Sequence, residues 1–219
     1  MTDNFGSYSL PASRLKNLWV STSMSVKSFQ DRKEYIANIA STIFCKKGYK
    51  TASLQDIAKK GNLSKAGIFH YFKTKEDILS YILIRNSDNF IAILKSCIKE
   101  NGERNFDREM SLRNLINTYA THVNKWKEGR LLTLQERHQL TGKNKKALLK
   151  KERMLFHLIK DELKKVKQID KRYNLNVVSF LIIAMSHWLG YWLDEDGELS
   201  QEQAISQNID IVFRGIFGN

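Results

Sequence analysis

The stretch from Ser53 to Lys75, SLQDIAKKGNLSKAGIFHYFKTK, constrains the fold more than any other part of the chain. Its first residue is a favourable helix N-cap, and Asp56 three positions later completes a capping box. The pair Gly61-Asn62 is expected to end this helix, because both residues enter the left-handed conformation at low cost. Ser64 then caps a second short helix. The pattern therefore predicts two short helices joined by a tight turn, which is a helix-turn-helix.

The second helix of this motif has one face for packing and another for recognition. Ile68 and Phe72 are four residues apart and point to one side. At the start of the helix, the small residues Ala66 and Gly67 allow a close approach to base edges, and Lys65 is long enough to reach guanine or phosphate. The residues expected to contact nucleic acid in and around the motif are Ser53, Ser64, Lys65, Ala66, Gly67, Phe69, His70, Tyr71, Thr74 and Lys75.

Another capping pattern, at Thr74 to Asp77, starts the next helix. We expect the free N–H groups of its first turn, together with Lys75, to form a corner that binds a phosphate. The charge of the region supports this, since Lys27 to Arg85 contains 12 Lys and Arg against 5 Asp and Glu. A helical hairpin with no recognition role is the alternative for a capped helix pair alone, and the basic setting disfavours it.

Composition extends the helical prediction to the whole chain. One Pro and 11 Gly among 219 residues leave few places for the chain to break, and the abundance of Leu, Ile and Lys favours helix. A hydrophobic content of 42% is enough to bury a core. We therefore predict an all-α fold. The net charge of +13 and the pI near 9.7 imply an acidic partner, either nucleic acid or an anionic membrane surface.

The sequence lacks the usual patterns of catalysis. It contains no His-Glu-x-x-His motif, no phosphate-binding glycine loop and no nucleophile elbow. Cys45 and Cys97 have the spacing of neither metal ligands nor a disulfide framework. We therefore expect no enzyme activity, no metal site and no cofactor. No window approaches the roughly 18 apolar residues of a membrane span, and the N-terminus lacks the apolar core of a signal peptide, so the expected location is the cytoplasm.

The order of polar and apolar segments predicts two helical domains after a largely disordered extension at residues 1–28. The expected helices are about Asp31–Lys47, the two of the motif, Lys75–Lys99, Asp107–Lys127, Arg130–Leu140, Lys143–Gln168, Asn174–Leu193 and Ser200–Ile216. The polar segment Asn101–Asn105 is the clearest break. We assign residues 29–76 to the DNA-binding domain and residues 77–219 to a second domain.

The region from Asp31 to Leu79 resembles the DNA-binding domain of the tetracycline-repressor (TetR) family of bacterial transcription regulators. The matching segments are FCKKGY at 44–49, DIA at 56–58, LSK at 63–65, HYF at 70–72 and KEDIL at 75–79. One position departs from the family, because Phe69 stands where a Tyr hydroxyl usually bonds a DNA phosphate. The resemblance implies a DNA-binding head, a long connecting helix and a C-terminal domain for ligand binding and dimerisation.

The last two expected helices are the most apolar part of the chain. Residues 177–192 leave almost no polar face, so that helix has to be buried on all sides, and one monomer can hardly cover it. With a second stripe at 204–216, the pair fits half of a four-helix bundle completed by a twofold mate, as in the resembled family. The expected contacts of this homodimer are Val178, Leu181, Ile182, Met185, Leu189, Ile205, Ile209, Val212 and Phe213.

A further group of aromatic and apolar residues with a few polar tips has the composition of a ligand pocket. Its members are Tyr119, His122, Trp126, Phe156, Ile159, His187, Trp188 and Tyr191. A plain core uses the same residue types, so both interpretations stay open. The segments Leu132–Leu140 and 185–192 (MSHWLGYW) resemble the branch of the TetR family that senses acyl-coenzyme A, which implies an acyl thioester as the effector. The Lys-rich segment 143–172 is either a site for the coenzyme phosphates or a solvated basic face.

The leading hypothesis is a homodimeric repressor that binds a palindromic operator in double-stranded DNA. A small-molecule effector, for which acyl-CoA is the first candidate, would release it. Two alternatives stay open at this point. One is a basic architectural DNA-binding protein without an effector, and the other is a peripheral protein whose Lys-rich helix binds anionic membranes.

Overall fold

The computed structural model describes residues 28–125, 127–192 and 198–217, with side chains except at 127–131 and 190–192. Within these residues the secondary structure is helical throughout, which confirms the all-α prediction. The elements are α1 (Phe29–Lys47), α2 (Leu54–Lys60), α3 (Lys65–Tyr71), α4 (Lys75–Glu103), α5 (Arg108–Lys125), α6 (Lys127–Glu136), the 3-10 turn η3 (Arg137–Gln139), α7 (Gly142–Lys164), α8 (Leu175–Trp192) and α9 (Gln201–Phe217). The expected disordered extension at 1–28 falls almost entirely outside the described residues.

Serine and threonine caps start the helices around the motif. The expected capping boxes are present at Ser53, whose side chain accepts from the N–H of Asp56, and at Thr74, which caps α4 in the same way. Ser64 caps α3 by accepting from the N–H of Gly67 at 2.9 Å. Each cap satisfies a backbone donor that the first turn of a helix leaves free, so these bounds follow from local sequence.

The turn between α2 and α3 uses its two residues differently from the prediction. Asn62 adopts the left-handed conformation, with φ of 48°, whereas Gly61 has a φ of −88°. Gly61 is needed for space instead, because a Cβ there would lie 2.8 Å from Cδ1 of Ile39 and 3.2 Å from the carbonyl oxygen of Ile57. The hydroxyl of Tyr35 also donates to the carbonyl oxygen of Gly61 at 3.2 Å. The glycine therefore lets α2 end against α1.

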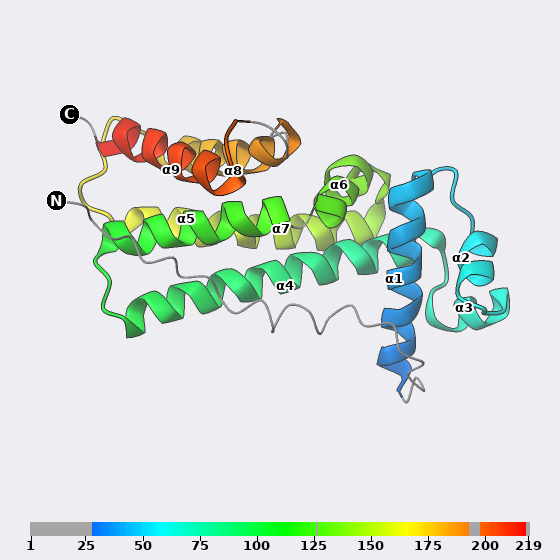
Figure 1. The fold of residues 1–219 in the computed structure, drawn as a ribbon. Helices are drawn as coiled ribbons and strands as arrows, with labels where there is room; N and C mark the ends of the chain where they lie inside the picture. The colour runs from blue at the N-terminus through cyan, green and yellow to red at the C-terminus, as the bar shows by residue number, and fades with distance from the viewer. Residues whose placement is uncertain (1–27, 126, 193–197, 218–219) are drawn as a thin grey trace.

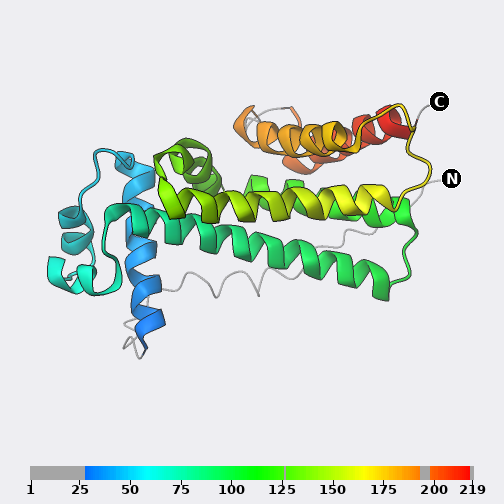
Figure 2. The same cartoon turned by 180° about the vertical axis from the view of Figure 1, so that it is seen from behind.

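The helices form a head at one end of a layered body (Figure 1). In the head, α1 crosses the start of α4, and α2 and α3 lie beyond it. In the body, α4 packs on α5 and α7, which in turn carry α8 and α9 as an outer layer (Figures 1 and 2). The short α6 lies where the body meets α1. The long helix α4 therefore runs from the head along the body.

Buried side chains gather into two main clusters in the described part of the chain. The head core contains α1, α2, α3 and the start of α4, and it also includes Leu132, Leu140 and Leu148 from α6, its following turn and α7. The body core is formed by the far half of α4 with α5, α7, α8 and α9. The packing boundary therefore does not coincide with the expected division at residue 76. Both α4 and α7 pass through the two cores.

The expected break after α4 lies a few residues later than its sequence suggests. The helix continues through Gly102 to Glu103, and the chain turns at Asn105, which has a positive φ of 53°. The backbone N–H groups of Asn105 and Phe106 bond back to the last carbonyls of the helix. The side chain of Asn101 is buried and donates to the carbonyl oxygen of Ser111 at 3.0 Å, which holds the last turn against α5.

Candidate DNA-binding face and effector region

Helix α3 exposes the residues that were expected to meet DNA. Lys65, Ala66, Phe69 and His70 are exposed, while Gly67 is half-buried. The opposite side of α3 is buried through Ile68 and Phe72 in the head core. A basic residue, small residues and an aromatic ring thus lie on one open face of a helix. This arrangement suits insertion into a major groove.

Phe29, which the sequence interpretation missed, supports the open face of α3. It is the first residue of α1, and its ring lies 4.6 Å from the ring of Tyr71 and 5.8 Å from that of His70. Lys33, one turn further along α1, places its ammonium 5.3 Å from the ring centre of Phe72. The only local signal was an aromatic residue directly after Ser28, which caps α1. Its partners lie too far away in sequence for periodicity to reveal them.

Lys75 does not form the expected phosphate-binding corner. Its ammonium donates to the carbonyl oxygens of Tyr49 and Ala52, each at 2.7 Å, and to that of Lys50 at 3.3 Å. It also lies 4.4 Å from the ring centre of Tyr49. An ammonium has three donors, and here three carbonyls use them. Lys75 therefore fastens the loop between α1 and α2 to α4, and this corrects the prediction.

Ser53 and Thr74 also use their side chains within the chain. The hydroxyl of Ser53 accepts from the N–H of Asp56 at 3.1 Å and donates to its carboxylate at 2.7 Å. Hydrogen bonds from Lys47 and then Ser53 lower the pKa of Asp56. Thr74 accepts from the N–H of Asp77 at 3.0 Å. Both hydroxyls are thus helix caps, and each shapes the position of the helix that it starts.

A polar clasp joins the head to the beginning of α7. The carboxylate of Glu76 accepts from the backbone N–H of Thr141 at 2.8 Å, from its hydroxyl at 3.1 Å and from the amide of Asn144 at 3.3 Å. The same amide donates to Asp77 at 3.2 Å. Burial alone would raise the pKa of Asp77, but hydrogen bonds from Asn144 and Thr74 lower it. Glu76 therefore acts as a negative cap at the N-terminus of α7.

A second tie connects the head to α6, and a third joins the two long helices. The backbone N–H of Tyr49 donates to the carboxylate of Glu136 at 3.0 Å. Lys151 of α7 pairs with Asp88 of α4 at 2.5 Å. The head is thus held by α6 and α7 as well as by α4.

Three residues of the expected ligand pocket lie together in the body core. The hydroxyl of Tyr119 is 3.1 Å from Nε2 of His187, and the ring of His122 stacks on that of Phe90 at 4.3 Å. Phe90 also lies 4.8 Å from Tyr119. Burial raises the pKa of Tyr119 and lowers that of His122, and both shifts disfavour the charged form of the side chain. The group combines apolar rings with a few polar tips, as a site for an amphipathic ligand does.

The other expected pocket residues are scattered. Ile159 is fully buried in the body core, and Phe156 packs its ring 4.7 Å from that of Phe180. Trp188 points outward and is 60% exposed. Trp126 lies outside the described residues, and the side chain of Tyr191 is not among those described. Of the expected pocket residues, the structure therefore brings together those around Tyr119, and it adds Phe90, which the sequence interpretation did not include.

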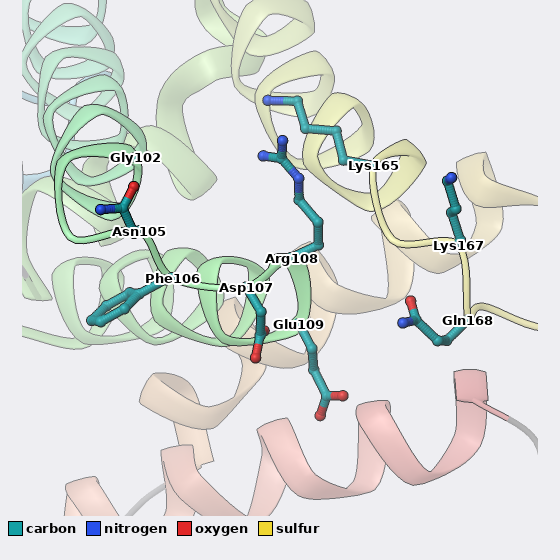
Figure 3. A pocket seen from close by; sticks show the side chains of 9 residues that line it. All are labelled: Gly102, Asn105, Phe106, Asp107, Arg108, Glu109, Lys165, Lys167 and Gln168. Atoms are coloured by element: carbon teal, nitrogen blue, oxygen red, sulfur yellow. The ribbon is translucent and has the colours of Figure 1, made fainter.

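Two hollows open on the surface away from this group. One, of about 790 Å³, lies where α4 meets α5 beside the end of α7, at the end of the body opposite the head (Figure 3). Arg108 and Lys165 point to the same side of it, while Asp107 and Glu109 point the other way. The second hollow, of about 550 Å³, lies between α1, the start of α4 and α7. Both are lined by side chains of mixed charge.

The outer layer of the body exposes several apolar side chains, and we call this surface the α8–α9 face. Its exposed residues are Val177, Phe180, Leu181, Ala184, Trp188 and Ile211. Single exposed apolar residues are normal on a protein surface, but five large ones on neighbouring helices form a patch. Such patches are typical of interaction sites.

Most of the residues expected at the dimer interface lie instead in the core of a single chain. Val178, Ile182, Ile205, Ile209, Val212 and Phe213 are buried within the body core of a single chain, and Met185 and Leu189 are partly buried against it. Of the predicted set, Leu181 is the residue on the α8–α9 face, with 54% exposure. The correction has a simple cause, because a helix that is apolar all round carries no polar residue to mark which side faces its own core.

Two further observations concern other classes of site. Among the described residues, no group of three or more His, Cys, Asp or Glu side chains could hold a metal ion. In the same part of the chain, no helix has the length and hydropathy needed to cross a membrane.

Both domains match family models of known regulators. Residues 36–82 match the model described as bacterial regulatory proteins of the tetR family, and residues 108–216 match the tetracyclin repressor-like C-terminal domain. Together the two models span most of the described chain. The chain belongs to the TetR family. It is therefore a transcriptional regulator with a helix-turn-helix DNA-binding domain, and not an enzyme.

Curated relatives and solved structures show what this chain is similar to. The regulator YvkB of Bacillus subtilis is 37% identical over 60 residues, which cover 27% of this chain and 32% of YvkB. This chain thus spans about a third of that relative. AibR in complex with isovaleryl coenzyme A and operator DNA has a TM-score of 0.73 at 23% identity, covering 83% of this chain and 98% of AibR.

A second solved relative binds a longer acyl chain. FadR from Bacillus subtilis in complex with stearoyl-CoA has a TM-score of 0.70 at 18% identity, covering 84% of this chain and 98% of FadR. Identities this low show a shared fold alone. Members of the TetR family bind operator DNA and small-molecule effectors, and this chain has the helix-turn-helix head that DNA binding requires.

Proposed function

We propose that this protein is a homodimeric repressor that leaves a palindromic operator when a small molecule enters its body. The observation that carries the proposal is the pairing of two features in one chain. One is the open face of α3 in the head, and the other is the apolar α8–α9 face on the outer layer of the body. The first face is suited to binding DNA, and the second exposes apolar side chains that a partner surface would bury. We place the protein in the cytoplasm, where an operator is accessible.

A second copy of the chain is the proposed cover of the α8–α9 face. Phe180 and Leu181 are 62% and 54% exposed, and water around such side chains is unfavourable. Two antiparallel helices that present the same face to a twofold mate bury it in an isologous four-helix bundle. The arrangement places the two heads on one side of the dimer, so that two α3 helices enter successive major grooves about 34 Å apart.

The proposed release mechanism is geometric. Both α4 and α7 pass from the body core to the head core, and the clasp at Glu76 fixes their ends to each other. A ligand that separates these helices near Phe90 would tilt α4 and move α3. Because both heads have to match their half-sites at once, a small displacement removes most of the specific contacts. By linkage, operator DNA then weakens ligand binding by the same factor.

An acyl-CoA is the proposed effector. The support consists of the acyl-CoA ligands of the two fold relatives, the resemblance at residues 185–192, and the group around Tyr119, which offers apolar rings with neutral polar tips. An acyl chain would lie among the rings, while the coenzyme would remain nearer the surface. The exposed lysines of α7 offer positive charge for its phosphates.

Footprinting with and without acyl-CoA tests the proposed function. We expect protection of a palindrome with two half-sites, which isovaleryl-CoA or stearoyl-CoA removes. Lys65→Ala is the matched variant, because it should relax sequence preference without changing the fold of the exposed α3 face. Diffuse protection without release would support an architectural DNA-binding protein instead. Stronger binding to anionic vesicles than to DNA would support the membrane alternative.

A further inference from the structure

The amide nitrogen of Asn86 is buried inside the body without a hydrogen-bond acceptor. The residue is 7% exposed, and none of the described residues accepts a hydrogen bond from its Nδ2. Other buried amides of the chain are paired. The Nδ2 of Asn101 donates to the carbonyl oxygen of Ser111 at 3.0 Å, and that of Asn124 donates to the carbonyl oxygen of Ser186 at 3.1 Å. Asn86 therefore stands apart from the buried asparagines around it.

An unpaired amide in a core is unfavourable for folding. In the unfolded chain its N–H groups bond to water, and burial removes those bonds without replacement. A leucine of similar size at the same position would carry no such cost. Buried polar groups that the protein leaves unpaired are typical of sites where a ligand supplies the missing partner.

The position of Asn86 relates it to both cores. Ile82, one turn before it on α4, belongs to the head core, and Phe90, one turn after it, belongs to the body core. Side chains four residues apart share one face of a helix. Phe90 contacts the rings of Tyr119 and His122. The amide thus lies at the head-side edge of the group that we assign to the effector.

We propose that Asn86 anchors the effector by donating a hydrogen bond from Nδ2 to a carbonyl oxygen of the ligand. The inference rests on the proposed function, in which a small molecule occupies the body. The free group is an N–H donor, so the ligand has to supply an acceptor. Ile82 and Phe90 on either side require an apolar chain next to that oxygen. The ligand class is therefore a carbonyl compound with an apolar chain.

Two sources supply this chemistry, an acyl thioester and a free carboxylic acid. Ile82 and Phe90, which lie one turn to either side of Asn86, offer no positive charge to a carboxylate, and a carboxylate would lose its hydration to a neutral donor. The carbonyl of a thioester carries no charge and needs only the one hydrogen bond. We therefore expect the thioester to bind and the free acid to bind more weakly.

The variant Asn86→Leu, measured in the full chain, tests this assignment. Without any small molecule, its Tm should rise by about 2 to 4 °C, because the unpaired donor is gone. The concentration of stearoyl-CoA or isovaleryl-CoA that releases operator DNA should rise about tenfold. The S-alkyl coenzyme A thioethers of matching chain length lack the carbonyl oxygen. They should act about tenfold more weakly than the thioesters on the wild type and equally with them on the variant.

Asn89→Leu is the matched control, since Asn89 is exposed on the same helix, one turn away from Arg85 and outside the core. It should leave the Tm and the response to thioesters unchanged. A lower Tm for Asn86→Leu would overturn the proposal, because it would mean that the amide has a partner within the chain. An unchanged preference for thioester over thioether would overturn it too.

The outcomes also separate this inference from the proposed function. If neither the thioesters nor free stearate and isovalerate remove the operator footprint, the carbonyl ligand is wrong. The protein would then still be a DNA-binding regulator. Loss of a palindromic footprint in the wild type would instead overturn the proposed function. Release by stearate at lower concentration than by stearoyl-CoA would contradict the neutral-carbonyl assignment.

Discussion

The head and the outer layer of the body differ in how much their local sequence specifies. In the head, Ser53, Ser64 and Thr74 each mark the start of a helix, and the helices begin where these caps predict. In α8, neighbouring apolar residues differ in burial, because Ile182 is 1% exposed and Leu181 is 54% exposed. Polar residues orient a helix, and a helix without them is oriented only by what packs against it.

Substitutions at two adjacent positions in α8 should test this difference with the largest expected effect. Ile182→Glu places a carboxylate in the body core and should cost about 3 to 5 kcal/mol, enough to unfold much of the protein. Leu181→Glu should change the stability of the isolated chain by less than about 0.5 kcal/mol, since the side chain points outward. Urea unfolding followed by circular dichroism, at a protein concentration too low for the proposed dimer to form, distinguishes them. Similar losses from both would show that α8 is rotated from the described orientation.

In the head, Lys75→Met should lower the stability of the fold, because Lys75 has a structural role. The variant loses the hydrogen bonds to the carbonyl oxygens of Tyr49 and Ala52, with an expected cost of about 2 kcal/mol. Lys73→Met is the control, because Lys73 is exposed and should change stability little. Thermal unfolding of the DNA-free proteins measures the difference. Equal stability of the two variants, with weaker DNA binding for Lys75→Met alone, would restore the phosphate-contact assignment.

The contrast explains what could be predicted from sequence. The helix-turn-helix, the order of helices and the packing face of α3 follow from residues within one or two turns of each other. The role of Lys75 depends on carbonyls more than 20 residues away, and the clasp between Glu76 and Thr141 joins segments still further apart. A basic residue beside a capping box has the same local pattern whether it binds DNA or its own chain.

The effector region was predictable only in composition. Tyr119 and His187 were grouped because both combine an aromatic ring with a polar tip, and the Tyr119 hydroxyl lies 3.1 Å from Nε2 of His187, although their role in ligand binding stays a prediction. Trp188 has the same character and points to the outside instead. Asn86 has no local signal at all, since an asparagine within a long amphipathic helix usually faces water. Which residues converge depends on the crossing of α4, α5 and α8, and no periodicity encodes that crossing.

At the joint between the two regions, Glu76→Gln should weaken the clasp. The neutral amide keeps the shape but removes the negative charge at the start of α7, which should cost about 1 kcal/mol. The ratio of operator affinities without and with acyl-CoA should fall, because α4 and α7 would no longer move together. Glu103→Gln, at the exposed far end of α4, should change neither quantity. An unchanged affinity ratio for Glu76→Gln would exclude the clasp from signal transmission.

The smallest expected effect is a pH dependence in the body. Burial lowers the pKa of His122 below its unfolded value, so the unfolded chain binds the extra proton first. Stability should therefore decrease as pH falls from about 7 towards 5, above the range where carboxylates titrate. His122→Gln should flatten this part of the profile. A wild-type stability that rises on acidification over that range would contradict the buried, neutral imidazole.

Light scattering of the wild type and Leu181→Glu after size exclusion tests the central claim most directly, because the regulatory account depends on the α8–α9 face joining two chains. At micromolar concentration we expect the wild type at twice the chain mass of 25.5 kDa, and Leu181→Glu as a folded particle of one chain mass with weakened binding to a full palindrome. A wild type that is monomeric at that concentration, and still binds the full palindrome tightly, would contradict the account.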